Sequence, residues 1–152
     1  LLAYIFMNVG AFAIVIVLSH KNDEFIQIND YAGLGFKHPL LAIAMTIFMF
    51  SMAGVPPMAG FVGKFYIFSA AIKSGYVVLA IIGVINSVIS VYYYLRITVI
   101  MYMKEPAREF TPLTLSPFIV AAIVISVIGT LQLGIFPSKV MEMAQQATLI
   151  LK

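Results

Sequence analysis

The chain has 152 residues, of which 62% are hydrophobic and only 10% are charged, whereas a soluble domain has about 25% charged residues. The formal charge is +3 and cysteine is absent, which excludes a disulfide scaffold, a cysteine-ligated zinc site and an iron–sulfur cluster. Apolar runs long enough to cross a bilayer alternate with short charged clusters, and no basic stripe is present for nucleic acid. This pattern excludes a soluble enzyme and predicts an all-α, polytopic transmembrane helical bundle.

Residues 1–19 form the first predicted span, because this stretch is apolar except for Asn8 and Ser19. A polar connection over 20–38 follows and is too charged to enter lipid. The chain opens with Leu1-Leu2-Ala3, inside an apolar run and without an initiator Met, and it has neither the charged region nor the cleavage site of a signal peptide. We therefore expect this sequence to be a piece of a longer protein.

The stretch 39–73 is the unusual element. Its apolar halves, 40–53 and 58–72, are separated by Gly54-Val55-Pro56-Pro57. An unbroken helix of this length would reach about 50 Å, more than the ~30 Å hydrocarbon core, and the two prolines remove backbone donors. Two short spans, or one crossing made by a broken helix, both fit the pattern. The Lys and Arg content of the loops favours the single broken crossing by a small margin.

Three further elements complete the chain. Residues 76–103 predict a long span, and 117–136 predict another that begins at a Ser-Pro helix start. Residues 138–152 predict an amphipathic tail, a short helix lying at the membrane interface. Together with 1–19 and 39–73, these elements predict a single transmembrane region with about four crossings.

Lys64 is the candidate functional residue, because it lies inside an apolar segment that holds no acidic residue. An ionisable side chain in a membrane helix costs at least about 2.5–3.5 kcal/mol and indicates a functional site by default. Desolvation disfavours the ammonium form, so a lysine here can exchange between its two forms and relay a proton. The alternative is a snorkelling lysine, or a structural partner of a carboxylate elsewhere. Helix-end dipoles at the broken backbone would bias its protonation, and the residues of that break are Gly54, Pro56, Pro57 and Gly60.

Four other polar residues are candidates to support Lys64: Tyr66, Asn86, Ser90 and Arg96. Asn86 and Ser90 could hydrate a channel, although hydrogen bonds between helices are their commoner role. Arg96 could pair with an acidic group or anchor at the headgroups, and the tyrosines that precede it are more typical of an interfacial belt. The sequence has no phosphate loop, metal-ligand spacing or nucleophilic triad, so we expect no covalent catalysis within this chain.

Two long stretches resemble a known family. HPLLAIAMTIFMFSMAGVPPMAGFVGKFYIFSAAIKSG and LAIIGVINSVISVYYYLRITVIMYM closely resemble the subunit N family of bacterial NADH–quinone oxidoreductase (respiratory complex I), and AYIFMNVGAFA near the start also fits. The resemblance covers nearly the whole chain and corresponds to about the last third of an antiporter-like membrane subunit. Sibling subunits often carry an acidic residue directly after the lysine, whereas Phe65 stands here, which favours subunit N.

The resemblance implies that 39–73 is the broken helix of a second inverted repeat and that Lys64 is a proton-relay lysine on an exit half-channel. It implies a multi-pass subunit of the bacterial inner membrane, with the 20–38 and 104–115 loops on the cytoplasmic side. Neighbouring antiporter-like and small membrane subunits would be its partners. Flavin, iron–sulfur clusters and quinone would lie in other subunits, and this chain would bind no cofactor and no metal. Two rival functions stay open: a sodium/proton antiporter subunit without redox coupling, and a structural membrane scaffold.

Overall fold

The computed structural model describes residues 1–19, 27–106, 113, 115–138, 140 and 142. Its helices are α1 (Leu2–Leu18), the 3-10 helix η1 (Ile28–Tyr31), α2 (Leu34–Lys37), α3 (Pro39–Ala53), α4 (Ala59–Lys73), α5 (Val77–Met103) and α6 (Pro117–Ile135). No strand occurs among these residues, so the predicted all-α fold is confirmed. The amphipathic tail predicted over 138–152 lies outside the described residues, apart from 138, 140 and 142.

Two of the helices, α5 and α6, are long and apolar enough to cross a membrane, and α1 and α3 are shorter apolar helices. The 27 residues of α5 extend about 40 Å, which exceeds the ~30 Å hydrocarbon core and leaves room for tilt. Large apolar side chains are exposed along all of α5, from Val78 through Ile89 to Val99. A helix that exposes large apolar side chains along its whole length requires lipid or other protein around it.

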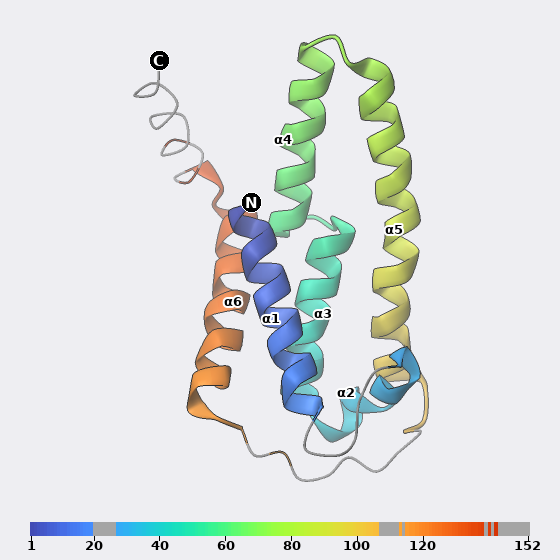
Figure 1. Ribbon diagram of the computed structural model, residues 1–152, viewed down its shortest axis with the longest axis vertical. Coiled ribbons are helices and arrows are strands. Elements are labelled where there is room, and N and C mark those ends of the chain that lie inside the picture. Colours follow the sequence, from blue (N-terminus) through green and yellow to red (C-terminus); the bar gives the residue numbers. More distant parts are fainter. Residues whose placement is uncertain (20–26, 107–112, 114, 139, 141, 143–152) are drawn as a thin grey trace.

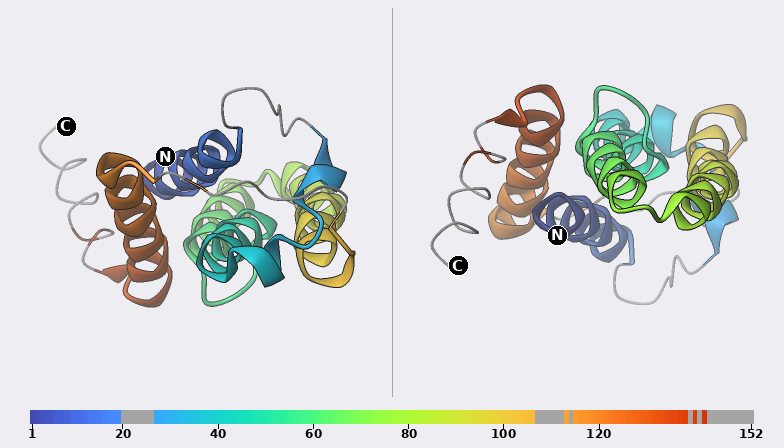
Figure 2. Two further views of the ribbon diagram at one scale, coloured as in Figure 1. Left: turned by 90° about the horizontal axis from the view of Figure 1, so that it is seen from below. Right: turned by 90° about the horizontal axis from the view of Figure 1, so that it is seen from above.

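Helices α3 and α4 follow one another in the same direction, and α5 runs back beside both of them (Figure 1). Seen end-on, α3 and α4 lie between α5 on one side and α6 on the other, with α1 packed against α3 and α6 (Figure 2). Helix α4 and the facing part of α5 extend beyond the other helices (Figure 1). The junction between α3 and α4 is therefore surrounded by α1, α5 and α6.

The break between α3 and α4 follows from its residues. Gly54 has φ +90°, a left-handed conformation that glycine adopts without a steric penalty, and it ends α3. Pro56 and Pro57 then supply no backbone donors, so α4 begins only at Ala59. A Cβ on Gly60 would collide with the main-chain carbonyl oxygen of Ser51, so only glycine allows the two helices to approach this closely.

The packed core lies mainly between α1 and α3 below the break, with further buried residues from α5 and α6. Phe48 of α3 is fully buried, and its ring lies on Gly10 of α1, where a Cβ would collide with it. The described residues of the predicted 20–38 connection include two short helices: α2 contributes the fully buried Leu34, and η1 the buried Tyr31. These two short helices close the end of the bundle opposite the α4–α5 turn (Figure 1).

Candidate functional site

Lys64 lies five residues after the start of α4, and its side chain reaches back to the end of α3. Side chains on a helix lean toward the helix N-terminus, which here is the break. The Nζ atom donates hydrogen bonds to the main-chain carbonyl oxygens of Met52 at 3.0 Å and Ala53 at 3.1 Å. It donates a third to the Ser87 Oγ of α5 at 2.8 Å, so Lys64 joins three helices at one point.

The final carbonyl groups of α3 all have partners. The Gly54 and Val55 amides donate to the Phe50 carbonyl, and the Gly54 amide also reaches the Ser51 carbonyl at 3.0 Å. The remaining carbonyls of the last turn, on Met52 and Ala53, accept from Lys64. A helix C-terminus carries a partial negative charge, so it stabilises the ammonium group. Lys64 thus caps α3 from the following helix.

The three acceptors around Nζ are all neutral, and no acidic side chain among the described residues is one of them. An ammonium group has three protons, one for each acceptor. After loss of one proton, the Ser87 hydroxyl can rotate and donate to the amine. The site therefore satisfies the charged form fully and can also accommodate the neutral form.

Lys64 borders two cavities. One of about 410 Å³ lies between α1, the end of α3, α4 and α5. Its α5 wall is a polar stripe of helical spacing: Gly83, Asn86, Ser87, Ser90 and Tyr94. The other, of about 480 Å³, lies between α4 and α5, and Ser69, Ile72 and Val88 are part of its lining. Both volumes are large enough for several water molecules. The Nζ atom thus has two spaces through which a proton could arrive or leave.

The structure brings some of the predicted supporting residues to Lys64 and leaves others apart. Asn86 and Ser90 line the 410 Å³ cavity, and Ser90 Oγ donates to the Ser87 carbonyl at 2.7 Å. Tyr66 is 45% exposed, and its ring lies edge-on to that of Phe65. Arg96 is exposed and lines neither cavity. Of the break residues, Gly54 packs on the Lys64 side chain and Gly60 lines the 410 Å³ cavity.

Two contacts were not predicted from the sequence. Ser87, rather than Asn86 or Ser90, is the direct partner of Lys64. The buried Ser51 Oγ accepts a hydrogen bond from the Gly60 amide at 3.0 Å, which ties the two sides of the break together. The polar stripe from Gly83 to Tyr94 is the sequence signal for Ser87, and the position of Ser51 in the last turn before Gly54 is the signal for Ser51.

The chain is similar to a known family and to several of its members. A family model described as "NADH:quinone oxidoreductase/Mrp antiporter, TM" matches residues 1–90. The NADH-quinone oxidoreductase subunit N of Trichlorobacter lovleyi is 53% identical over 97% of this chain and 30% of its own length. Subunit N 1 of Solibacter usitatus is 47% identical over 100% of this chain and 32% of its own length.

A solved structure is also similar. A chain of respiratory complex I from Thermus thermophilus with bound Aureothin has a TM-score of 0.77 and 31% identity, covering 90% of this chain and 31% of that one. The resemblance to subunit N stated from the sequence is therefore confirmed. The chain spans about a third of the length of these relatives.

Proposed function

The chain belongs to the NADH:quinone oxidoreductase/Mrp antiporter transmembrane family, and from this premise we propose that it serves in a proton-translocating membrane subunit of NADH–quinone oxidoreductase. The subunit would cross the bacterial inner membrane several times, beside other antiporter-like and small membrane subunits. NADH oxidation and quinone reduction would take place elsewhere in the assembly. This chain's part would be to move protons through Lys64.

We further propose that α3 and α4 make one broken crossing. They continue in the same direction, and the single antiparallel helix α5 lies beside both (Figure 1). The last carbonyl groups of α3 accept from the Gly54 and Val55 amides and from Lys64, and the Gly60 amide at the start of α4 donates to Ser51 Oγ. Irregular backbone is tolerated at membrane depth when it is buried in protein or lines a cavity. Here Gly54 lines the 480 Å³ cavity, and Ser51 and Ala59 on either side of the break are buried.

The observation that carries the relay proposal is the neutral surroundings of Lys64 Nζ. A snorkelling lysine extends its ammonium toward headgroups, whereas this one turns toward the break and binds main-chain oxygens. A structural ion pair would place a carboxylate beside it, and none is among its partners in the described chain. Protonation of Lys64 is thus held by hydrogen bonds that a small movement can break.

The free energy of the hydrogen bonds to the Lys64 ammonium group is suited to a proton relay. A hydrogen bond to a charged group contributes about 1.5–3 kcal/mol. Withdrawal of one acceptor, such as Ser87 Oγ, would therefore change the ratio of charged to neutral lysine by roughly ten- to 150-fold. A shift of α5 against the break would load or release the proton. Water in the two cavities would carry the proton to and from Nζ.

The experiment is NADH-driven proton pumping in inverted membrane vesicles, with the full-length subunit carrying Lys64→Ala or Lys64→Arg. We expect pumping per NADH to fall in both variants while the complex assembles in normal amount, because Arg retains its charge permanently. Unchanged pumping in an assembled Lys64→Ala complex would show that the lysine is structural.

A sodium/proton antiporter subunit is the second candidate, because the family description names Mrp antiporters beside the oxidoreductases. The most similar relatives reported above are oxidoreductase subunits, which supports the first candidate. The two differ in what copurifies and in the ion that moves. Vesicles should acidify on NADH addition in sodium-free buffer if the first is right, and should require an imposed sodium gradient if the second is right.

A further inference from the structure

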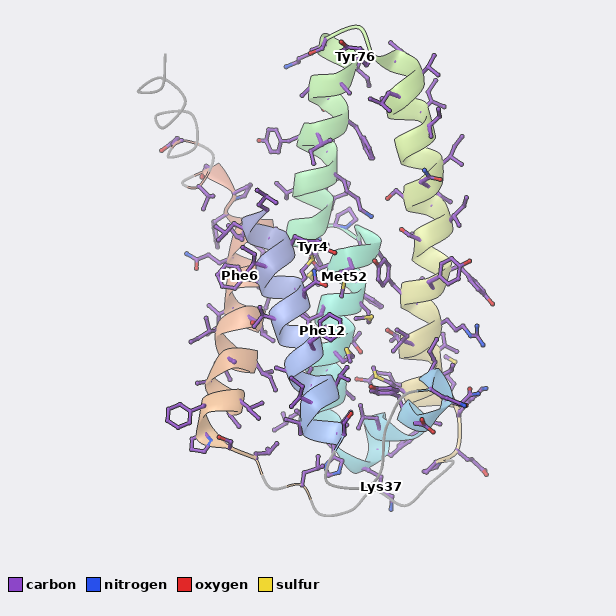
Figure 3. All side chains as sticks on the ribbon, viewed as in Figure 1. Tyr4, Phe6, Phe12, Lys37, Met52 and Tyr76 are labelled. Carbon is purple, nitrogen blue, oxygen red and sulfur yellow. The ribbon has the colours of Figure 1, made fainter. Side chains whose placement is uncertain are left out.

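A third cavity continues the 410 Å³ space beside Lys64 toward the other end of the bundle. Its volume is about 300 Å³, and it lies between α1, η1, α3 and α5. Tyr4 lines the first space and Phe12 the third, whereas Met52 and Tyr94 line both. In Figure 3 the labelled Tyr4, Met52 and Phe12 follow one another from the base of α4 toward the α2 end. Met52 and Tyr94 therefore form the partition between two spaces in series.

The third cavity has an apolar wall and a polar far end. Met45, Met49 and Met52 occupy successive turns of α3, over about 10 Å of helix, and Phe12 faces the same space. Tyr31 of η1 lies at the end nearest the polar connection. Burial and the neighbouring Asp30 charge raise the pKa of the Tyr31 phenol, so it remains a hydrogen-bond donor at neutral pH. Hydrophobic constrictions in channels block water and protons by dewetting, and the apolar lining of this cavity favours the same behaviour.

Met52 also contacts the relay lysine directly. Its main-chain oxygen accepts a hydrogen bond from Lys64 Nζ, and its flexible thioether side chain lies in the partition. When Lys64 leaves that oxygen, the last turn of α3 loses a cap, and the Met52 side chain is free to move with it. The protonation state of Lys64 and the width of the partition are thus linked through one residue.

We propose that Met52 and Tyr94 form a gate, which controls a proton path between Lys64 and the η1 end of the bundle. This inference rests on the proposed function, because a gate has a purpose only if Lys64 exchanges protons. Tyr94 differs in its exposure from the two tyrosines that precede it. Tyr92 and Tyr93 are 64% and 60% exposed and contact each other edge-on, whereas Tyr94 is half-buried between the two cavities.

The test measures access of a charged, membrane-impermeant thiol reagent to the space beside Lys64. Gly63→Cys is the reporter, because Gly63 lines that cavity with nothing within 4 Å of an added Cβ, and the chain has no cysteine of its own. The full-length subunit would be assembled into the complex, with other reactive cysteines blocked, in vesicles that expose the η1 end. Met52→Ala and Tyr94→Leu widen the partition, and Tyr93→Leu is the matched control.

We expect Met52→Ala and Tyr94→Leu each to raise the labelling rate from the η1 side at least tenfold, with Tyr93→Leu unchanged. Equal labelling rates in all assembled complexes would overturn the gate. Met52→Ala keeps the main-chain oxygen and decides the matter alone if Tyr94→Leu does not assemble. Labelling does not depend on pumping, so the two proposals fail separately: normal pumping by Lys64→Ala would refute the relay, and unchanged labelling would refute the gate.

Discussion

Helices α3 and α4 end in the same way, yet only one of the two ends is a candidate site. Gly54 and Gly75 both adopt left-handed conformations, with φ of +90° and +84°. Val55 donates to Phe50 and Tyr76 donates to Ala71, which are equivalent hydrogen bonds of a glycine-terminated helix. The difference lies in the next carbonyls: at α3 they accept from Lys64, which comes from another helix, whereas the lysine nearest the end of α4 is the exposed Lys73.

This comparison shows that the helix end by itself does not make the site. A C-terminus stabilises a cation wherever it lies, but water and headgroups screen that effect at an exposed turn. At the break, α1, α5 and α6 pack against α3 and α4, and the same partial charges act on a half-buried amine, where screening is weaker. The site consists of a common type of helix C-terminus, that of α3, which lies inside the bundle and whose last carbonyl groups accept hydrogen bonds from Lys64.

The largest effect is expected from closing the break itself. Gly60→Ala would place a Cβ against the Ser51 carbonyl, force α3 and α4 apart and destabilise the subunit by about 3 kcal/mol or more. The yield and thermal stability of the assembled complex would measure this loss of stability. Gly63→Ala is the control, because its Cβ meets open space. Equal losses in the two variants would show that the close approach at Gly60 does not matter.

The two helix ends can be compared directly with Gly54→Ala and Gly75→Ala. Each forces a left-handed alanine, which costs about 1–2 kcal/mol. At Gly54 the new methyl group would also lie 3.2 Å from Lys64 Cδ, whereas nothing lies near Gly75. We expect similar losses of thermal stability in both variants, and about tenfold lower pumping only in Gly54→Ala.

An equal fall in pumping for Gly54→Ala and Gly75→Ala would contradict this comparison. It would mean that backbone strain, rather than displacement of the lysine, limits pumping.

Ser87→Ala should alter the pH dependence of pumping rather than abolish it. The substitution removes one acceptor from the ammonium group, worth about 1.5–3 kcal/mol. Because the ammonium form loses a stronger hydrogen bond than the neutral amine does, the proton leaves at lower pH, and the pumping profile should move down by about one pH unit. Ser90→Ala is the control, since Ser90 Oγ bonds the Ser87 carbonyl and not Lys64. A profile that stays in place for Ser87→Ala would exclude this hydrogen bond from the relay.

The smallest effect is expected at the exposed end of α4. Lys73→Ala removes a cation from the last turn, where its interaction with the helix dipole is worth about 0.3–1 kcal/mol. Pumping should be unchanged, and thermal stability should fall only slightly. A loss of pumping comparable to that of Lys64→Ala would mean that the two lysines are not distinguished by their surroundings.

The sequence contained the position of the break and the exceptional lysine, because both are local features. Gly54 and the Pro56-Pro57 pair end a helix whatever surrounds them, and a lysine in an apolar run is visible from composition. The all-α fold followed from hydropathy alone. The acceptors of Lys64 were not readable in this way, because they depend on how α3, α4 and α5 meet.

Two of the predicted supporting residues show that closeness in sequence does not predict contact with Lys64. Tyr66 is only two positions from Lys64, but residues two apart on a helix do not share a face. Arg96 is nine residues beyond Ser87, which is about 13 Å along α5. Ser87 and Ser90 lie on the stripe that faces Lys64, and only the register of α5 against α4 decides which of them reaches the amine.

The most direct test of the account replaces the amine of Lys64 by one of different basicity. Lys64→Cys removes it, and aminoethylation of that cysteine restores an amine of similar length that is less basic than lysine. The unsubstituted complex receives the same treatment as a control. The account predicts that Lys64→Cys loses NADH-driven pumping and that aminoethylation restores it with a pH profile moved to lower pH. Pumping that survives in Lys64→Cys, or that returns with an unmoved profile, would contradict it.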